Sequence, residues 1–155
     1  MVIREVGILF RGFTLISVSY HEVAGNTIDQ DLRSSLLTAL LNFAESVFSS
    51  NAIEYFQMNK FIICFIKDQI ISSDSPEPEL LMYYVILDKQ KRIDKFIRKI
   101  IQPILKQVCS EFKNRYNKKN LSEISQFKDF KQILDTCFDS HSKTIEQRMW
   151  GTLFD

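Results

Sequence analysis

The sequence has few of the residues and motifs on which catalytic sites are commonly built. Its four glycines do not cluster, so no glycine-rich loop is available to bind phosphate. Its two histidines, His21 and His141, lie in different regions, and no GxSxG, HExxH, Walker or GxGxxG pattern occurs. We therefore expect a protein that is not an enzyme and that has no cofactor and no metal site.

Cysteine is also scarce. The three cysteines, Cys64, Cys109 and Cys137, are odd in number and form no CxxC motif, each has an apolar neighbour in sequence, and Cys64 lies within an apolar run. This pattern is typical of buried free thiols in a reducing compartment, and a metal-binding or nucleophilic role is the alternative.

Long apolar runs and an excess of one charge are missing as well. No run approaches the roughly 20 apolar residues of a membrane-spanning helix, and Arg4, Glu5 and Arg11 interrupt the segment that a secretory signal would need to be apolar. The net charge of +1 argues against a whole surface that attracts nucleic acid or acidic lipid. We expect a cytoplasmic protein that binds no nucleic acid and has at most peripheral contact with membranes.

What the chain has is enough apolar surface for one folded domain. It contains 155 residues, of which 45% are hydrophobic and 25% charged, as is usual for a globular protein. The segment Ser34–Phe48 has no charge before Glu45, and its apolar residues form two neighbouring rows at helical spacing. The first row is Leu36, Leu40, Phe43 and Val47, and the second is Leu37, Leu41, Ala44 and Phe48. A helix with so broad an apolar side packs in a core, lies on a membrane or binds a partner.

Five β-strands are predicted. Residues 3–10 and 13–20 flank Arg11-Gly12 and predict a hairpin. Three more strands are expected at 52–58, 60–67 and 79–87. The runs at 61–66 and 80–87 are apolar without alternation, which is typical of strands covered on both faces. Alternate residues of 80–87 should therefore face two different helical layers.

Three helices are predicted. The first spans 28–48 and begins at a capping box of Thr27 and Gln30. The second spans 89–117 with a kink at Pro103, and the third spans 121–138 with Asn120 as its cap. The buried stripe of the third helix should comprise Ile124, Phe127, Phe130, Leu134 and Phe138. We assign 1–138 to one domain and 139–155 to a C-terminal tail.

The order of these elements, with segments such as VGILFRGFTLISVSY and LLMYYVIL, resembles the longin domain. The resemblance implies an α+β fold, in which a five-stranded antiparallel sheet of order 2-1-5-4-3 carries one helix on one face and two on the other. The 155 residues contain no long heptad segment and no membrane anchor like those of a longin SNARE, so we expect the resemblance to be to the longin domain and not to a whole SNARE.

The resemblance also implies a function. It predicts a non-catalytic protein-interaction module, an adaptor in membrane trafficking or small-GTPase regulation, whose partner is a small GTPase or another longin or roadblock domain. A homodimer paired through the third strand or the first helix is expected too. The alternatives are a subunit of a larger coat or tethering complex and a small-molecule sensor with a pocket between sheet and helices.

The expected binding surface combines the first helix, the third strand and the tail. Arg33 and Asn42 would rim a GTPase contact, and the tail around Trp150 would dock near the second row of the first helix and the third strand. The predicted partner-binding residues are Arg33, Leu37, Leu41, Asn42, Phe48, Tyr55, Phe56 and Trp150.

The second predicted helix is strongly basic on its polar side. Its basic residues are Lys89, Lys91, Arg92, Lys95, Arg98, Lys99 and Lys106. Such a face can meet acidic lipid or phosphate, and the alternative is the solvated side of an ordinary amphipathic helix.

Overall fold

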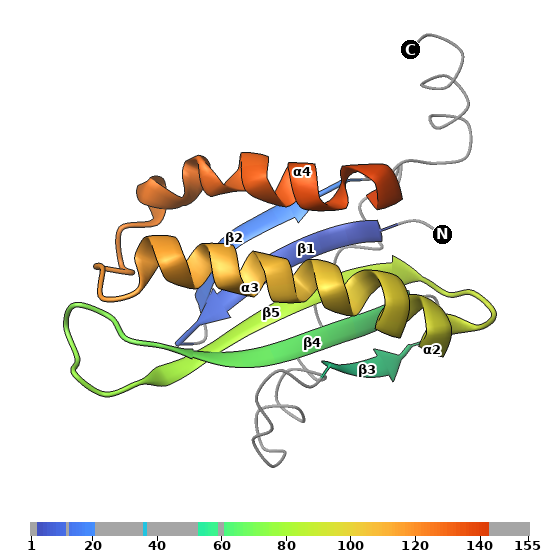
Figure 1. The fold of residues 1–155 in the computed structure, drawn as a ribbon, viewed down its shortest axis with the longest axis horizontal. Helices are drawn as coiled ribbons and strands as arrows, with labels where there is room; N and C mark the ends of the chain where they lie inside the picture. Colours follow the sequence, from blue (N-terminus) through green and yellow to red (C-terminus); the bar gives the residue numbers. More distant parts are fainter. Residues whose placement is uncertain (1–2, 12, 21–35, 37–52, 59–60, 143–155) are drawn as a thin grey trace, which may run out of the picture.

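The computed structural model describes residues 3–11, 13–20, 36, 53–58 and 61–142, and the structural statements below concern these residues. The strands are β1 (Ile3–Phe10), β2 (Phe13–Ser19), β3 (Ile53–Gln57), β4 (Phe61–Ile70) and β5 (Glu79–Asp88). The helices are α2 (Ile93–Phe96), η1 (Ile97–Ile101), α3 (Gln102–Tyr116), η2 (Ile124–Lys128) and α4 (Phe130–Ser142). The strands form one antiparallel sheet in the order β2-β1-β5-β4-β3, as predicted (Figure 1).

The central strand, β5, is buried on both faces because successive side chains of a strand point to opposite sides. Leu81, Tyr83, Val85 and Leu87 belong to the larger buried cluster, together with side chains of the helices. Tyr84 and Ile86 belong to a second buried cluster, against which Met82 packs. The prediction that this strand is covered on both faces is therefore confirmed, whereas a helical layer over the second face stays a prediction.

Helices α3 and α4 lie side by side over one face of the sheet (Figure 1). Four aromatic rings join them where α3 ends and α4 begins. Phe112 lies 5.6 Å from Phe127 and 5.2 Å from Phe130, and Tyr116 lies 4.8 Å from Phe127, each measured between ring centroids. Aromatic pairs at such distances add roughly 0.5–1.5 kcal/mol each beyond the area that they bury, so this cluster fixes the helical layer.

The opposite face of the sheet carries the second buried cluster. One residue of the helix predicted over 28–48 is described: Leu36 is helical, 5% exposed and part of the cluster with Ile63, Phe65 and Tyr84. The rest of that helix lies outside the described residues. The arrangement of one helix against two therefore stays a prediction beyond this single residue.

The second predicted helix keeps one buried face along its length, but it consists of an α-helical, a π-helical and a second α-helical segment. The chain first makes a turn at Arg92, whose φ of 59° is left-handed, so the helix begins at Ile93 and not at residue 89. The predicted interruption at Pro103 takes the form of a π-helical segment, Ile97–Ile101. Proline cannot donate the usual backbone hydrogen bond and its ring clashes with the carbonyl four residues earlier, which a wider turn accommodates.

The third predicted helix begins later than expected. Asn120 does accept a hydrogen bond from the Ser122 backbone N–H at 3.0 Å, but that bond closes a turn and not a helix. A 3-10 segment follows, and α4 starts only at Phe130. Phe127, Phe130, Leu134 and Phe138 are buried as predicted, whereas Ile124 is 56% exposed, so the prediction was wrong for Ile124.

Candidate functional site

The described residues contain no evident reactive centre. No group of three or more His, Cys, Asp and Glu side chains in the described ranges could hold a metal ion. The three cysteines are free, and burial raises the pKa of the Cys64 thiol to about 12 and that of Cys109 further still. Thiols with raised pKa values are mostly protonated near neutral pH and are poor nucleophiles. Among the described helices, none is long and apolar enough to cross a membrane.

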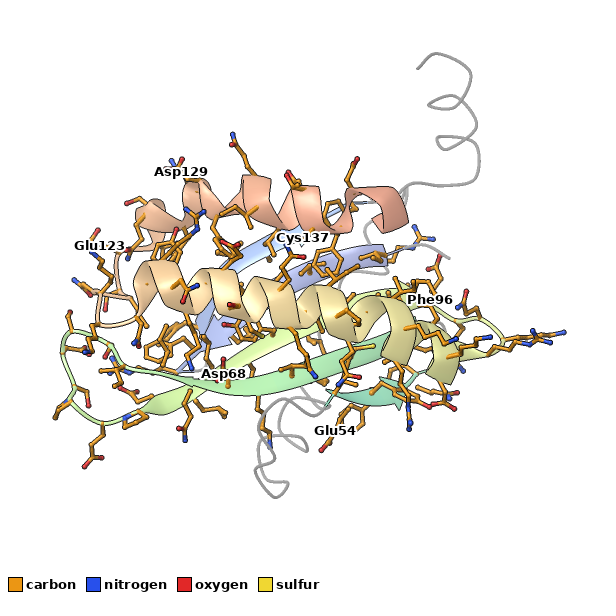
Figure 2. The ribbon with its side chains drawn as sticks, in the orientation of Figure 1. Glu54, Asp68, Phe96, Glu123, Asp129 and Cys137 are labelled. Carbon is orange, nitrogen blue, oxygen red and sulfur yellow. The ribbon has the colours of Figure 1, made fainter. Side chains whose placement is uncertain are left out.

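The predicted edge position of the third strand is confirmed, since β3 pairs with β4 at one end of the sheet. Its residues Ile53–Phe56 are all half-buried and Gln57 is exposed. Glu54 lies at this edge, on the side of the sheet remote from α4 (Figure 2). A short edge strand that carries apolar side chains is a surface to which another strand can add.

Tyr55 and Phe56 lie on opposite faces of β3. Tyr55 packs against the larger cluster, and its hydroxyl donates to the Asp94 carboxylate on α2, which raises the pKa of Tyr55. Phe56 packs against the second cluster, with its ring centroid 5.7 Å from that of Phe65 in an edge-to-face arrangement. A segment docked on one face of the sheet would therefore contact only one of these two predicted site residues.

The other predicted partner-binding residues fall outside the described ranges. These are Arg33, Leu37, Leu41, Asn42, Phe48 and Trp150. The structure therefore brings together only the β3 part of the predicted surface.

The face that carries Phe56 also contains buried polar groups. Glu5 is 4% exposed, and its carboxylate accepts hydrogen bonds from the Tyr84 hydroxyl at 2.6 Å and from the Ser19 hydroxyl at 3.2 Å. Lys67 is 3% exposed and lies two residues after Phe65 on β4, so it points to the same face. Buried polar groups that are hydrogen-bonded fix the position of what packs on them.

The opposite edge of the sheet has a groove that sequence reasoning missed. It lies between β2 and the η2–α4 region and has a volume of about 410 Å³. Its lining residues are Thr14, Leu15, Ile16, Ser17, Ile124, Ser125, Phe127, Lys128 and Lys131. Ile124 and Phe13, which are 56% and 70% exposed, are the two large hydrophobic side chains described as exposed.

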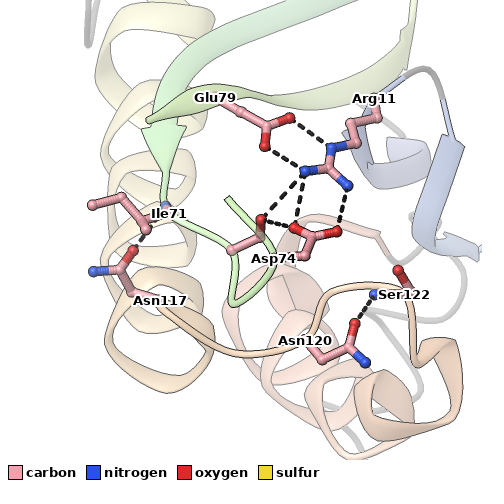
Figure 3. Close-up of polar contacts among 8 residues, drawn as sticks. Arg11, Ile71, Asp74, Glu79, Asn117, Asn120 and Ser122 are labelled. Carbon is pink, nitrogen blue, oxygen red and sulfur yellow. Dashed lines mark hydrogen bonds and ion pairs between the residues drawn. The ribbon is translucent and has the colours of Figure 1, made fainter. Parts of the chain in front are cut away.

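The densest polar cluster ties the two loops at one end of the sheet together. Arg11, in the β1–β2 turn with φ 51°, donates to Glu79 at 2.6 Å and to Asp74 at 3.0 Å (Figure 3). Asn117, at the end of α3, accepts from the Ile71 backbone N–H at 3.0 Å. These contacts hold the β4–β5 loop against its neighbours, and every partner is a group of the chain itself, so we interpret the cluster as structural.

Comparison with known proteins adds no assignment: no family model, no curated protein and no solved structure matches the chain. The longin resemblance stays a prediction from element order and sequence segments.

Proposed function

We propose that the chain is a non-catalytic protein-interaction module, a longin-like adaptor that acts in membrane trafficking or small-GTPase regulation. The observation that carries the proposal is β3, a short edge strand with half-buried apolar side chains on both faces. It belongs to a sheet whose strand order is the one that the longin resemblance implies. Strand addition at such an edge supplies main-chain hydrogen bonds, and the side chains next to it supply selectivity.

The partner is a small GTPase or another domain of the longin or roadblock kind. The partner contacts β3 together with the helix predicted over 28–48, in which Arg33 and Asn42 form the polar rim and Leu37, Leu41 and Phe48 the apolar part. A second copy of the chain, paired through the same edge, belongs to the same proposal. The protein works in the cytoplasm, at the periphery of membranes.

The second candidate, a subunit of a larger coat or tethering complex, uses the same surfaces but keeps them permanently covered. A small-molecule sensor requires a pocket between the sheet and the helices. Of the two described grooves, the one of about 510 Å³ lies between α3 and α4, and the one of about 410 Å³ lies between β2 and the η2–α4 region at the edge of the sheet. We favour the two forms of protein interaction because β3 offers an edge for strand addition.

The test begins with affinity capture of partners from a native extract, identified by mass spectrometry and then purified. Binding of the purified partner should weaken about tenfold on Arg33→Glu, since a reversed charge at the rim opposes association. Lys131→Glu, which makes the same charge change on α4, is the matched control and should leave binding unchanged. A partner set without any small GTPase, longin or roadblock domain contradicts the proposal, and so does equal binding by Arg33→Glu and the wild type.

A further inference from the structure

The charges of the chain are strongly segregated. Residues 89–119 contain eleven of the 20 Lys and Arg residues and only two of the 19 Asp and Glu residues. This segment therefore carries a net charge of +9, and the rest of the chain carries −8, although the total is only +1. A separation of this size creates a directed field that the net charge conceals.

Seven of these basic residues form one surface, which we call the basic end. All seven are exposed: Lys89, Lys91, Arg92, Lys95, Arg98, Lys99 and Lys106. The first three lie in the turn between β5 and α2. Lys95, Lys99 and Lys106 follow at helical spacing on the side away from the buried Ile97, Ile101 and Leu105, over about 17 Å of helix.

The two carboxylates nearest in sequence offset little of the charge of the basic end. Asp88 is paired with Arg4, with 2.7 Å between its Oδ1 and the Arg4 Nε, and Asp94, which accepts from the Tyr55 hydroxyl, is one negative charge beside seven positive ones. None of the seven basic side chains forms an ion pair with another described residue. Their charges are therefore available to a ligand.

The neighbouring helix limits how such a ligand can approach. On α4 and the residues just before it, Lys128 and Lys131 are outnumbered by Asp129, Asp135 and Asp139, all of them exposed. A negative surface laid flat over both helices would be repelled by these carboxylates. The favourable approach brings the ligand to the turn between β5 and α2 and to the first turns of the helix.

The chemistry of the basic end fits a planar anionic surface better than a shaped partner. Protein interfaces place apolar and aromatic side chains at their centre and are poor in lysine, whereas the centre of the basic end is made of Lys95, Arg98 and Lys99. Proteins that bind single-stranded nucleic acid stack bases on exposed aromatic rings, and the one aromatic residue within this part of the helix, Phe96, is half-buried. An anionic membrane needs neither feature, because it attracts clustered Lys and Arg through its surface potential.

We propose that the basic end is a membrane-attachment surface that binds bilayers rich in anionic phospholipid. The Tyr55–Asp94 contact joins β3 to α2, so a chain attached in this way keeps β3 close to the membrane. This proposal rests on the proposed function and adds to it the surface and the lipid class through which the protein would lie at the membrane. Membrane attachment and partner binding use different residues, so either proposal can fail without the other.

The test is flotation of the full chain with vesicles of phosphatidylcholine, with and without about 30% phosphatidylserine. Binding should require phosphatidylserine and should fall steeply as salt rises above about 0.1 M, where the Debye length shrinks below roughly 10 Å. The triple variant Lys95→Gln, Lys99→Gln, Lys106→Gln should bind about 100-fold more weakly, since each basic residue contributes roughly fivefold. Its melting temperature should be unchanged.

The matched control is Lys119→Gln, Lys128→Gln, Lys131→Gln, which removes the same charge from exposed positions elsewhere. It should weaken vesicle binding by no more than about threefold. An equal loss in both triple variants would overturn the assignment, because the attraction would then come from net charge. No binding to phosphatidylserine vesicles would overturn it too, as would tighter binding to a short DNA duplex than to the vesicles. Membrane attachment and partner binding are distinguished by partner capture with the triple variant of the basic end. This variant should capture the same partners as the wild type.

Discussion

The ring of Tyr84 lies directly against the backbone of Gly7, its neighbour across the β1–β5 ladder. A Cβ atom built on Gly7 would lie 2.3 Å from two of the ring carbons and 2.4 Å from the hydroxyl oxygen. Tyr84 is fully buried, and its hydroxyl donates to Glu5. Glycine at residue 7 therefore makes room for an aromatic side chain in the middle of the second face.

Replacing Gly7 by alanine should destabilise the fold. The ring of Tyr84 would have to leave its position and stretch or break the hydrogen bond to Glu5, and overpacking of this kind costs about 1–3 kcal/mol in the free energy of unfolding. Urea denaturation measures the change. In a Tyr84→Leu background the ring is absent, so Gly7→Ala should lower the free energy of unfolding by less than about 0.5 kcal/mol. Substitutions of residues in contact are not additive in this way. Equal costs in the two backgrounds would refute the close approach.

Tyr83 and Tyr84 should respond oppositely to removal of the hydroxyl. The Tyr84 hydroxyl donates to Glu5 at 2.6 Å, so Tyr84→Phe should lower the free energy of unfolding by roughly 1–3 kcal/mol. The Tyr83 hydroxyl is buried without a hydrogen bond of ordinary geometry to a described residue, and the Cys109 thiol that interacts with it is only a weak hydrogen-bonding group, so Tyr83→Phe should leave stability unchanged or raise it by up to about 1 kcal/mol. Denaturation of the two variants side by side tests this, and a similar loss in both would contradict it.

That Tyr83 and Tyr84 lie on opposite faces of the sheet could be predicted from the sequence. A central strand covered on both faces is mostly apolar at successive positions, and the run 80–87 shows this pattern. Strand geometry then assigns alternate residues to the two faces. The same rule separates Tyr55 from Phe56, and applying it to the predicted third strand would have shown that the two do not share a face.

The residue at which the third helix begins could not be predicted from the apolar pattern. Ile124, Phe127 and Phe130 are three residues apart, whereas Phe130, Leu134 and Phe138 are four apart. A spacing of three suits a 3-10 helix as well as an α-helix, so an apolar pattern alone does not separate the two. The groove beside β2 was equally hidden, because it forms where β2 meets a segment more than 100 residues later in the sequence.

The ion pairs of Arg11 should be visible in a titration of Asp74. The Arg11 guanidinium, aided by the Ser72 hydroxyl, lowers the pKa of Asp74 to about 2. A lowered pKa means that the ionised carboxylate favours the folded state: this contribution is complete above the unfolded value of roughly 3.9 and is lost as the pH falls through about 2.

An NMR titration of the Asp74 carboxyl group provides the measurement. In Arg11→Met the pKa of Asp74 should rise most of the way to its ordinary value, while the Ser72 hydroxyl still holds it somewhat below. Arg4→Met, which removes the ion pair with Asp88 instead, is the control and should not move it. A wild-type pKa of Asp74 near roughly 4 would rule out the Arg11 contacts in solution.

The tail prediction can now be made specific to one face of the sheet. If the segment around Trp150 docks on the side of the predicted first helix, its fluorescence should be blue-shifted and should move to the red in Phe56→Ser. Tyr55→Ser should leave the emission unchanged, because Tyr55 faces α2. Circular dichroism checks that both variants stay folded. A water-exposed Trp150 spectrum in the unaltered protein would end the idea, and an equal shift in the two variants would remove the face preference.

The central claim, that β3 is the docking edge, is tested most directly by site-specific photo-crosslinking. A photoreactive amino acid replaces Gln57, which is exposed on β3, or in the control Gln132, which is exposed on α4. With the purified GTPase or the longin or roadblock-type partner, we predict a covalent adduct from position 57 and none from position 132. Adducts from position 132 alone, or equal yields from both positions, would contradict the account.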